Sequence, residues 1–203
     1  HSAEQDLLVL AESIRDNLRQ WLKLSVTIGV GEGVSSLSEV PASYKQARAA
    51  ADQKWYLGKN RILTMDSIEP RENLRYRFEP DRAERVLSAL KSGDRDRLQA
   101  ELDAVFALLE LNRRQGSRYA QNISLDLILQ SSQIILELNG MTEEWEQKEM
   151  EAWQGVMQQE TIGDLQRYTE TYLRLVCDFV GSKRSGKAGD VIERIRLLID
   201  ERY

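Results

Sequence analysis

The spacing of apolar residues divides the chain into a short part with mixed helical and strand patterns and a longer, helical part. Apolar residues recur at helical spacing through residues 4–22, which predicts an amphipathic helix. A β-branched run at residues 25–31 contains two glycines and predicts a strand. A second helix is expected to begin at Pro41 and end at Gly58, and residues 61–64 predict a second strand. This α+β unit is only half of a normal sheet domain.

Beyond residue 77 the pattern is helical throughout. Predicted helices cover residues 80–93, 94–116, 117–140, 143–158 and 161–181. In the third of these, the expected core face consists of Leu125, Ile128, Leu129, Ile135 and Leu138. Serine, glycine and lysine fill residues 182–189, which predicts a linker before a last helix at residues 190–203.

The predicted fold class is therefore mainly α with a small α+β part. We expect five segments: an α+β segment (residues 3–67), a linker (68–77), a helical regulatory domain (78–181), a second linker (182–189) and a final helix (190–203). The first two residues are expected to be a cloning remnant, and the chain is expected to be part of a longer protein.

Composition excludes several classes of chemistry. The chain has 203 residues, of which 41% are hydrophobic and 30% are charged, as in ordinary globular proteins. No apolar run approaches the ~18–20 residues that cross a bilayer, so we expect a cytoplasmic protein without membrane contact. The only histidine is His1 and the only cysteine is Cys177, which excludes a catalytic triad, a Cys-based zinc site and an internal disulfide. No phosphate-binding loop motif is present. We therefore assign no catalytic, cofactor-binding or metal-binding residue.

Charge is unevenly distributed along the chain. Residues 78–183 carry 12 Lys and Arg against 19 Asp and Glu, whereas the segments on either side are each close to neutral. Because phosphate backbones repel an acidic surface, the helical part is a poor candidate for binding DNA. It is better suited to be a spacer, a dimerisation module or a reader of a signal.

Several residues allow both a functional and a structural interpretation. Gly29 and Gly31 could cradle a phosphate, but the end of a strand explains them as well. Asp52 and Lys59 could be remnants of nucleotide contacts, or solvated charges. Cys177 is expected to be a small buried apolar residue.

Two groups in the helical part are also ambiguous. Trp145, Met150, Trp153 and Met157 could line a ligand pocket, although their helical spacing favours a core or an interface. An arginine cluster could touch DNA, but its position at a helix end favours solvent and the helix dipole; it comprises Arg113, Arg114 and Arg118.

Three segments together resemble one family. Ser25–Leu63, SVTIGVGEGVSSLSEVPASYKQARAAADQKWYLGKNRIL, resembles the region between the receiver and DNA-binding domains of YesN-type response regulators of the AraC class. It is also similar to the second half of a diguanylate cyclase (GGDEF-like) domain. Residues 26–30 of this sequence match a strand of that domain, residues 47–57 match a helix, and residues 58–61 match the turn that follows the helix. A second segment, FEPDRAERVLSALKSGDRDRLQAELDAVF, resembles the start of the family's helical region. A third segment, DVIERIRLLIDERY, resembles the first helix of an AraC-type DNA-binding domain.

The resemblance implies a regulatory role rather than an activity. The GGDEF signature, the receiver's acidic residues and the recognition helix are all absent from the sequence. We expect a non-enzymatic homodimeric module that couples an upstream receiver, and its histidine kinase, to DNA binding by a separate C-terminal domain. A small-ligand sensor, binding an effector in the helical part, is the alternative, and a residual nucleotide-binding enzyme is the third.

Overall fold

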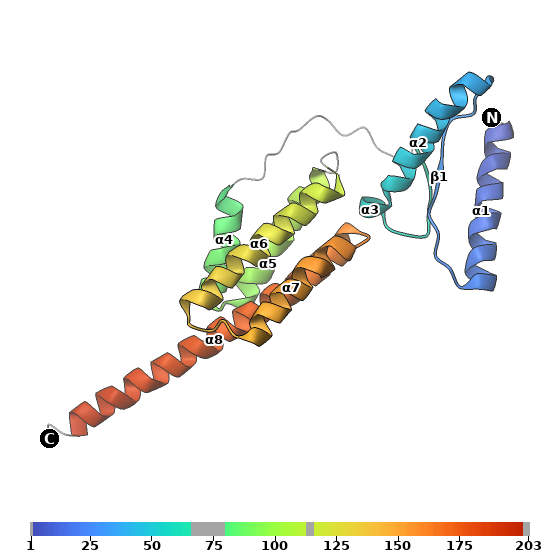
Figure 1. The fold of residues 1–203 in the computed structure, drawn as a ribbon. Helices are drawn as coiled ribbons and strands as arrows, with labels where there is room; N and C mark the ends of the chain where they lie inside the picture. Colours follow the sequence, from blue (N-terminus) through green and yellow to red (C-terminus); the bar gives the residue numbers. More distant parts are fainter. Residues whose placement is uncertain (1, 66–79, 113–115, 201–203) are drawn as a thin grey trace. The chain divides into compact units, whose positions relative to one another are not determined.

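The computed structural model describes residues 2–65, 80–112 and 116–200, and its chain forms two compact units. The first comprises residues 1–74 with 160–163, and the second comprises residues 75–159 with 164–203. Figure 1 shows a mainly helical chain with a small strand-containing part near its N-terminus, which confirms the predicted fold class. The linker predicted at 68–77 lies outside the described residues, as do Arg113 and Arg114.

The first unit has the predicted order of helix, strand, helix and strand. Its elements are α1 (Ser2–Leu22), β1 (Ile28–Val30), the 3-10 helix η1 (Leu37–Glu39), α2 (Val40–Asp52), α3 (Lys54–Leu57) and β2 (Ile62–Thr64). The strands pair in parallel, with Ile28 opposite Ile62 and Val30 opposite Thr64. Pro41 lies in the first turn of α2, where a missing N–H has no cost. Gly58 ends α3 at a φ of 91°, a conformation that favours glycine.

Alternate residues of β1 face different helices. A Cβ added to Gly29 would lie 1.9 Å from the carbonyl oxygen of Ala47, and one added to Gly31 would lie 2.1 Å from that of Ser43. Glycine at these two positions is what allows α2 to pack directly on the strand. Since successive side chains of a strand point to opposite faces, Ile28 and Val30 point away from α2, toward α1.

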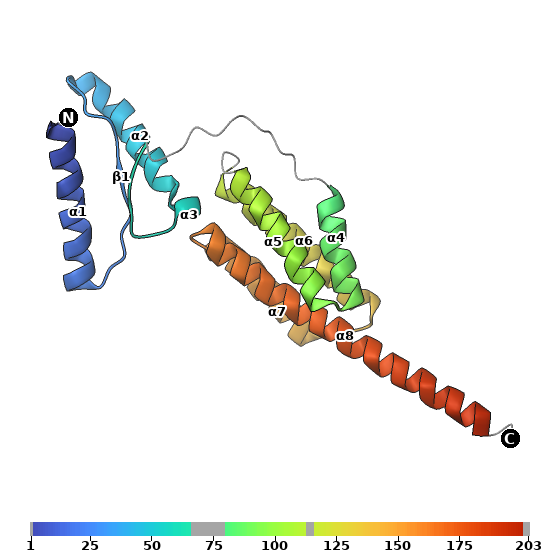
Figure 2. The same ribbon diagram turned by 180° about the vertical axis from the view of Figure 1, so that it is seen from behind.

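The second unit is a helical bundle. Its helices are α4 (Pro80–Ser92), α5 (Arg95–Leu111), α6 (Ser117–Glu137), α7 (Glu143–Gln158) and α8 (Ile162–Asp200). Figures 1 and 2 show α5, α6, α7 and the first half of α8 running side by side, with α4 beside α5 and α6. Asp94 caps α5 by accepting a hydrogen bond from the backbone N–H of Arg97, as its sequence position predicts. The largest fully buried side chains belong to this bundle: Phe106, Leu90, Leu98, Leu102, Leu109, Leu127, Ile128, Ile135, Leu165, Leu173, Val86 and Val105.

The core face predicted for α6 is partly wrong. Ile128 and Ile135 are buried, but Leu129 is 43% exposed and Leu125 and Leu138 are half-buried. The true face also includes small polar residues, which a search for apolar spacing does not count. The hydroxyls of two of them, Ser131 and Ser132, donate to the carbonyl of Ile128 at 2.7 and 3.2 Å, so their burial leaves no hydroxyl donor unused.

The linker predicted at residues 182–189 is also wrong, because α8 continues through this range as one helix. Each glycine in this range lowers the stability of the helix by about 1 kcal/mol relative to alanine. A helix that is already formed and packed can still be extended at that cost. The Ser182 hydroxyl donates to the carbonyl of Phe179 at 2.8 Å, within the same helix. As far as Asp200, where the described residues end, the final helix predicted at 190–203 is thus the end of α8 and not a separate element.

We predict that Gly29→Ala destabilises the first unit by about 1–3 kcal/mol, because the added methyl group collides with backbone that cannot move aside without separating α2 from β1. The measurement is hydrogen exchange of the β1, β2 and α2 amides. Gly33→Ala is the matched control, since no atom lies within 4 Å of its Cβ position. Equal exchange in the two variants would contradict this account of the glycines.

Candidate functional site

The structure places both candidate glycines of β1 against helix α2. Gly29 and Gly31 lie against the backbone of α2, and their role is close packing. Asp52 and Lys59, the other candidates for nucleotide contact, are both exposed and neither lines the groove described below. Within the described residues no group of three or more His, Cys, Asp or Glu side chains could hold a metal ion.

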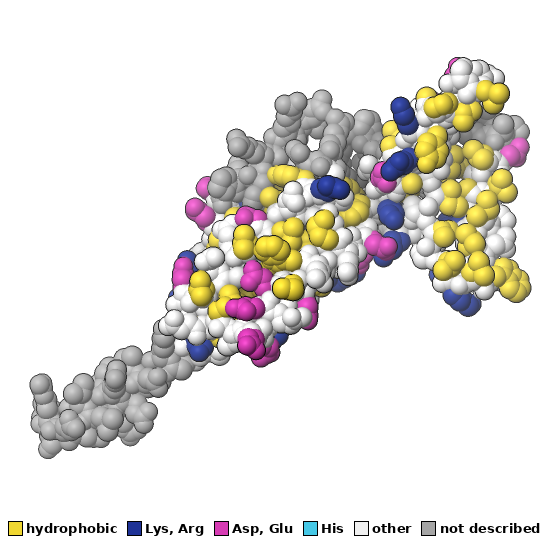
Figure 3. Space-filling model, in the orientation of Figure 1, with side chains coloured by type: hydrophobic (Ala, Val, Ile, Leu, Met, Phe, Trp, Pro, Cys, Tyr) yellow, Lys and Arg dark blue, Asp and Glu magenta, His cyan; other side chains and the backbone are white. Residues whose placement is uncertain are grey.

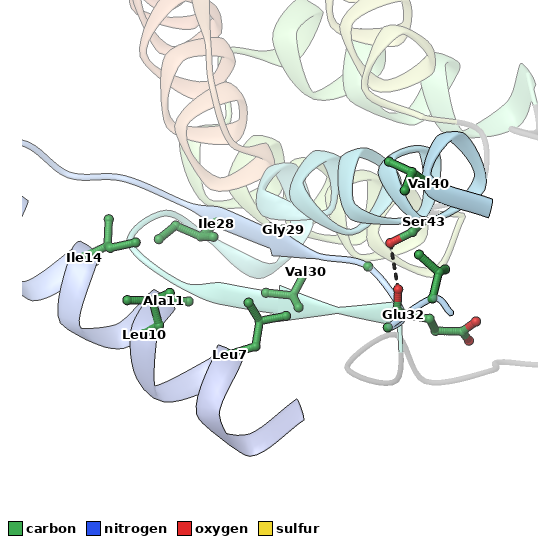
Figure 4. Close-up of a pocket in the computed structure, with 13 residues that line it drawn as sticks. Leu7, Leu10, Ala11, Ile14, Ile28, Gly29, Val30, Glu32, Val40 and Ser43 are labelled. Carbon is green, nitrogen blue, oxygen red and sulfur yellow. Dashed lines mark hydrogen bonds between the residues drawn. The ribbon is translucent and has the colours of Figure 1, made fainter. Parts of the chain in front are cut away.

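A groove of about 450 Å³ is present in the first unit (Figure 4). Its walls come from α1, from β1 with the loop that follows it, and from the start of α2. The lining residues are Leu7, Leu10, Ala11, Ile14, Ile28, Gly29, Val30, Gly31, Glu32, Gly33, Val34, Val40 and Ser43. Among the described residues, none from β2 lines this groove.

The chemistry of the groove is that of a packing surface. Leu7, Leu10 and Ile14 line it on the α1 side, and each of these side chains is between 43% and 56% exposed. Its one ionisable side chain, Glu32, is held by α2: the Ser43 hydroxyl donates to the Glu32 carbonyl at 2.7 Å, and the Gln46 amide donates to the Glu32 carboxylate at 3.2 Å. Apart from this tethered carboxylate, the side chains that line the groove are mostly apolar, so the groove is suited to hold an apolar group.

The Trp and Met group on α7 is not a core. Trp145 is half-buried and its ring meets that of Phe179 edge-on, with centroids 5.4 Å apart. Met150, Trp153 and Met157 are 59%, 44% and 54% exposed. Figure 3 shows hydrophobic side chains gathered over α6 and α7 on this face. Of the two expectations for these residues, a core or an interface, their exposure excludes the core, and the interface stays a prediction.

Helix α8 is anchored by aromatic side chains that occupy spaces left by glycines. A Cβ on Gly155 would lie 2.0 Å from the Tyr168 hydroxyl oxygen, and a Cβ on Gly140 would lie 2.0 Å from Cζ of Phe179. The Tyr168 hydroxyl donates to the backbone carbonyl of Glu151 at 3.0 Å. Burial, followed by the nearby Glu151 carboxylate, raises the pKa of Tyr168, so its proton stays in place across the physiological range.

Polar contacts connect α8 to α5 along the surface of the bundle. The Gln99 amide donates to the Glu170 carboxylate at 2.9 Å, and the Gln166 amide donates to the Asp103 carboxylate at 2.9 Å. Arg95 forms an ion pair with Asp178. Exposed pairs of this kind contribute at most about 1 kcal/mol each to the free energy of unfolding. They therefore matter more for the position of α8 along α5 than for the stability of the bundle.

Cys177 lies in the middle of this anchored segment. Its side chain is fully buried, as predicted, beside the buried Val176 of the same helix. Burial raises the pKa of the Cys177 thiol, with a smaller contribution from the Asp178 carboxylate. The reactive thiolate is therefore scarce, which fits a packing role.

Comparison with known proteins agrees with the N-terminal part of this picture. The profile of a family described as a GGDEF-like domain matches residues 1–52, about a quarter of the chain. No curated protein and no solved structure matches the chain. The match covers α1, β1 and α2, which together build the groove. A GGDEF-like segment is therefore present at the N-terminal end. Within the described residues no helix is both long and apolar enough to cross a membrane.

Sequence reasoning missed two features of the site. The groove lies between α1 and β1, and the apolar positions of α1 alone do not show that Leu7 and Leu10 stay partly uncovered. The continuity of α8 was hidden by the Ser and Gly residues at 181–189. One available signal was the lack of proline there, since proline is the residue that ends a helix.

We predict that the Cys177 thiol reacts with a disulfide reagent at pH 8 at least ~100-fold more slowly in the native chain than in urea, because burial removes both access and thiolate. Release of the thiol chromophore measures the rate, and the single cysteine makes the signal specific. A native rate close to the unfolded rate would mean that α8 separates readily from the bundle.

Proposed function

We propose that this chain is a non-enzymatic coupling module of a longer bacterial transcription regulator of the YesN type. It carries a signal from an upstream receiver, phosphorylated by a histidine kinase, to a downstream AraC-type DNA-binding domain. The regulator acts as a homodimer in the cytoplasm, and only its C-terminal domain touches DNA. The match to a GGDEF-like domain and the resemblance of the other two segments support this assignment.

The observation that carries the proposal is the continuity of α8. Its 39 residues span about 58 Å at 1.5 Å per residue, more than any other helix of the described chain. The first half is packed into the bundle through buried residues from Leu165 to Val180. The helix then continues to Asp200, inside the segment that resembles the start of the DNA-binding domain. A movement of the bundle would therefore be transmitted as a rigid-body movement of that domain.

The bundle is suited to transmit a movement and not to bind DNA itself. Five glutamates lie on α7, namely Glu143, Glu144, Glu146, Glu149 and Glu151, against a single lysine, Lys148. Such a surface is repelled by phosphates. The spacing of two DNA-binding domains in a dimer, set by their two α8 helices, is then the quantity that the signal changes.

A proline in the exposed part of α8 tests the coupling. In the full-length regulator, Ser185→Pro should break the helix at a cost of about 3 kcal/mol. We expect the variant to keep its affinity for a single DNA half-site but to lose most of the phosphorylation-dependent change in affinity for the complete operator. Ser185→Ala, which favours the helix, is the control and should respond like the wild type. A normal response of Ser185→Pro would contradict transmission through α8.

The non-enzymatic part of the proposal has its own test. Because the GGDEF signature is absent from the sequence, we expect no cyclic dinucleotide when the chain is incubated with GTP and magnesium. Chromatography of the nucleotides after a long incubation at high protein concentration provides the measurement. Product above a protein-free blank would overturn this part of the assignment while leaving the coupling role open.

A further inference from the structure

The outer surface of the bundle carries an apolar patch over α6 and α7. Five large side chains form it, and each is between 43% and 59% exposed: Leu129, Leu136, Met150, Trp153 and Met157. Leu129 and Leu136 are seven residues apart on α6, and the three residues of α7 follow one another at intervals of three and four. These spacings place the members of each helix on one helical face. These five residues are called the α6/α7 patch below.

The two halves of the patch lie next to each other. Helices α6 and α7 are antiparallel neighbours, and the Gln121 side-chain amide near the start of α6 donates to the Val156 carbonyl near the end of α7 at 3.4 Å. Leu129 follows Gln121 by about two turns, which brings it level with the middle of α7, close to Met150. Figure 3 shows hydrophobic side chains side by side over both helices. A contiguous exposed patch of this kind marks a binding surface more clearly than scattered apolar residues do.

Acidic side chains border the patch. Helices α6 and α7 together carry seven acidic residues, two on α6 and five on α7, against two cationic ones. Asp126 lies one turn before Leu129, and Glu146 and Glu149 each lie one turn before a patch residue of α7. Because residues one turn apart share a side of a helix, these three carboxylates lie along the patch.

The two cationic residues of these helices do not neutralise that border. Lys148 forms an ion pair with Glu144, and its Nζ atom lies 5.3 Å from the centroid of the Trp145 ring. Arg118 is in the first turn of α6, about three turns before Leu129. The border of the α6/α7 patch is therefore net negative.

The charge of the border decides between the possible occupants. In a symmetric pair of chains the same patch meets itself, so that the acidic borders of the two copies come together and repel. A surface of phosphate groups is repelled for the same reason. A helix with one apolar face and with lysine or arginine on its flanks fits both parts of the surface: its face covers the patch, and its flanks approach the carboxylates. The side chains of Met150 and Met157 are flexible enough to adapt to such a face, and tryptophan, as at Trp153, is enriched among the contacts that dominate binding energy.

We propose that the α6/α7 patch is the docking surface for a basic amphipathic helix of a partner protein. The partner helix carries apolar residues at helical spacing with lysine or arginine on both sides, and it lies along the line between α6 and α7. Its apolar face supplies most of the affinity, and its charges supply the orientation and the rate of encounter. This binding activity goes beyond coupling through α8 and does not depend on which domains precede or follow the chain.

Two synthetic peptides test this chemistry on the intact chain. Both are about 18 residues long, which as a helix covers the length of α7. They share leucines at the same helical spacing, and their remaining positions are lysine in one peptide and glutamate in the other. Fluorescence anisotropy of the labelled peptides measures the binding. We expect the lysine peptide to bind at least about tenfold more tightly than the glutamate peptide, and to lose affinity as the salt concentration rises.

Substitutions show whether the peptide binds at the patch. Met150→Lys and Leu129→Lys each add a charge of the same sign as the peptide, and each should weaken its binding at least about tenfold. Leu175→Lys is the matched control, because Leu175 lies on α8 outside the patch and is 45% exposed. Leu10→Lys, on the wall of the groove in the first unit, is a second control. Both controls should bind like the wild type. All four side chains are between 43% and 59% exposed, so the thermal unfolding midpoints should stay close to that of the wild type.

Four results would overturn the proposal. Equal affinity for the two peptides would show that the acidic border plays no part. Full affinity in both Met150→Lys and Leu129→Lys would place the peptide elsewhere. A dimer of the chain that Met150→Lys dissociates in sedimentation experiments would identify a second copy as the occupant. Binding to phosphatidylcholine vesicles that the same variant abolishes would identify a lipid surface. None of these measurements involves phosphorylation or operator DNA, so this inference can fail while coupling through α8 stands, and the reverse also holds.

Discussion

The packing of the first half of α8 is the constraint on which the proposed mechanism depends. Tyr168 and Phe179 fit against Gly155 and Gly140, where any larger residue would overlap the ring. These contacts fix both the rotation and the axial position of the helix in the bundle, because two rings separated by three turns must match two glycines at once. A helix fixed in this way moves with the bundle. Because the helix is continuous to Asp200, a movement of the bundle also moves the C-terminal end of α8.

The two units differ in how far they cover their own apolar residues. The second unit buries a large set of leucine, isoleucine and valine side chains around Phe106. Among the described residues of the first unit, the buried hydrophobic ones are Ala11, Ala50, Trp55, Leu63 and Ile162, whereas Trp21, Leu22 and Leu24 are between 52% and 74% exposed. The burial of apolar area is the main favourable contribution to folding, so the bundle is the more stable partner. The bundle can thus act as the rigid part of the module.

Much of this fold could be read from the sequence, and the errors have physical causes. Helices α1, α2 and α4 to α7 and both strands lie where periodicity, Pro41, Gly58 and Asp94 indicate. The errors concern residues whose environment is set by tertiary packing. Leu129 has the spacing of a core residue, yet small polar residues such as Ser131 lie on the buried face of α6. The glycines and serines after Val180 have the composition of a linker, yet they continue a helix that is held by its packed first half. The groove depends on how α1 meets β1, and no local pattern encodes that.

The small core of the first unit has a consequence for the sheet. A two-stranded sheet is marginal in water unless a further strand or a helix covers it. Helix α2 gives close cover at Gly29 and Gly31, but the α1 side retains a groove of about 450 Å³ lined by Leu7, Leu10 and Ile14. Each further Å² of apolar surface that is removed from water in this groove would stabilise the unit by about 25 cal/mol, so the open groove is a reserve of stability that the first unit does not use.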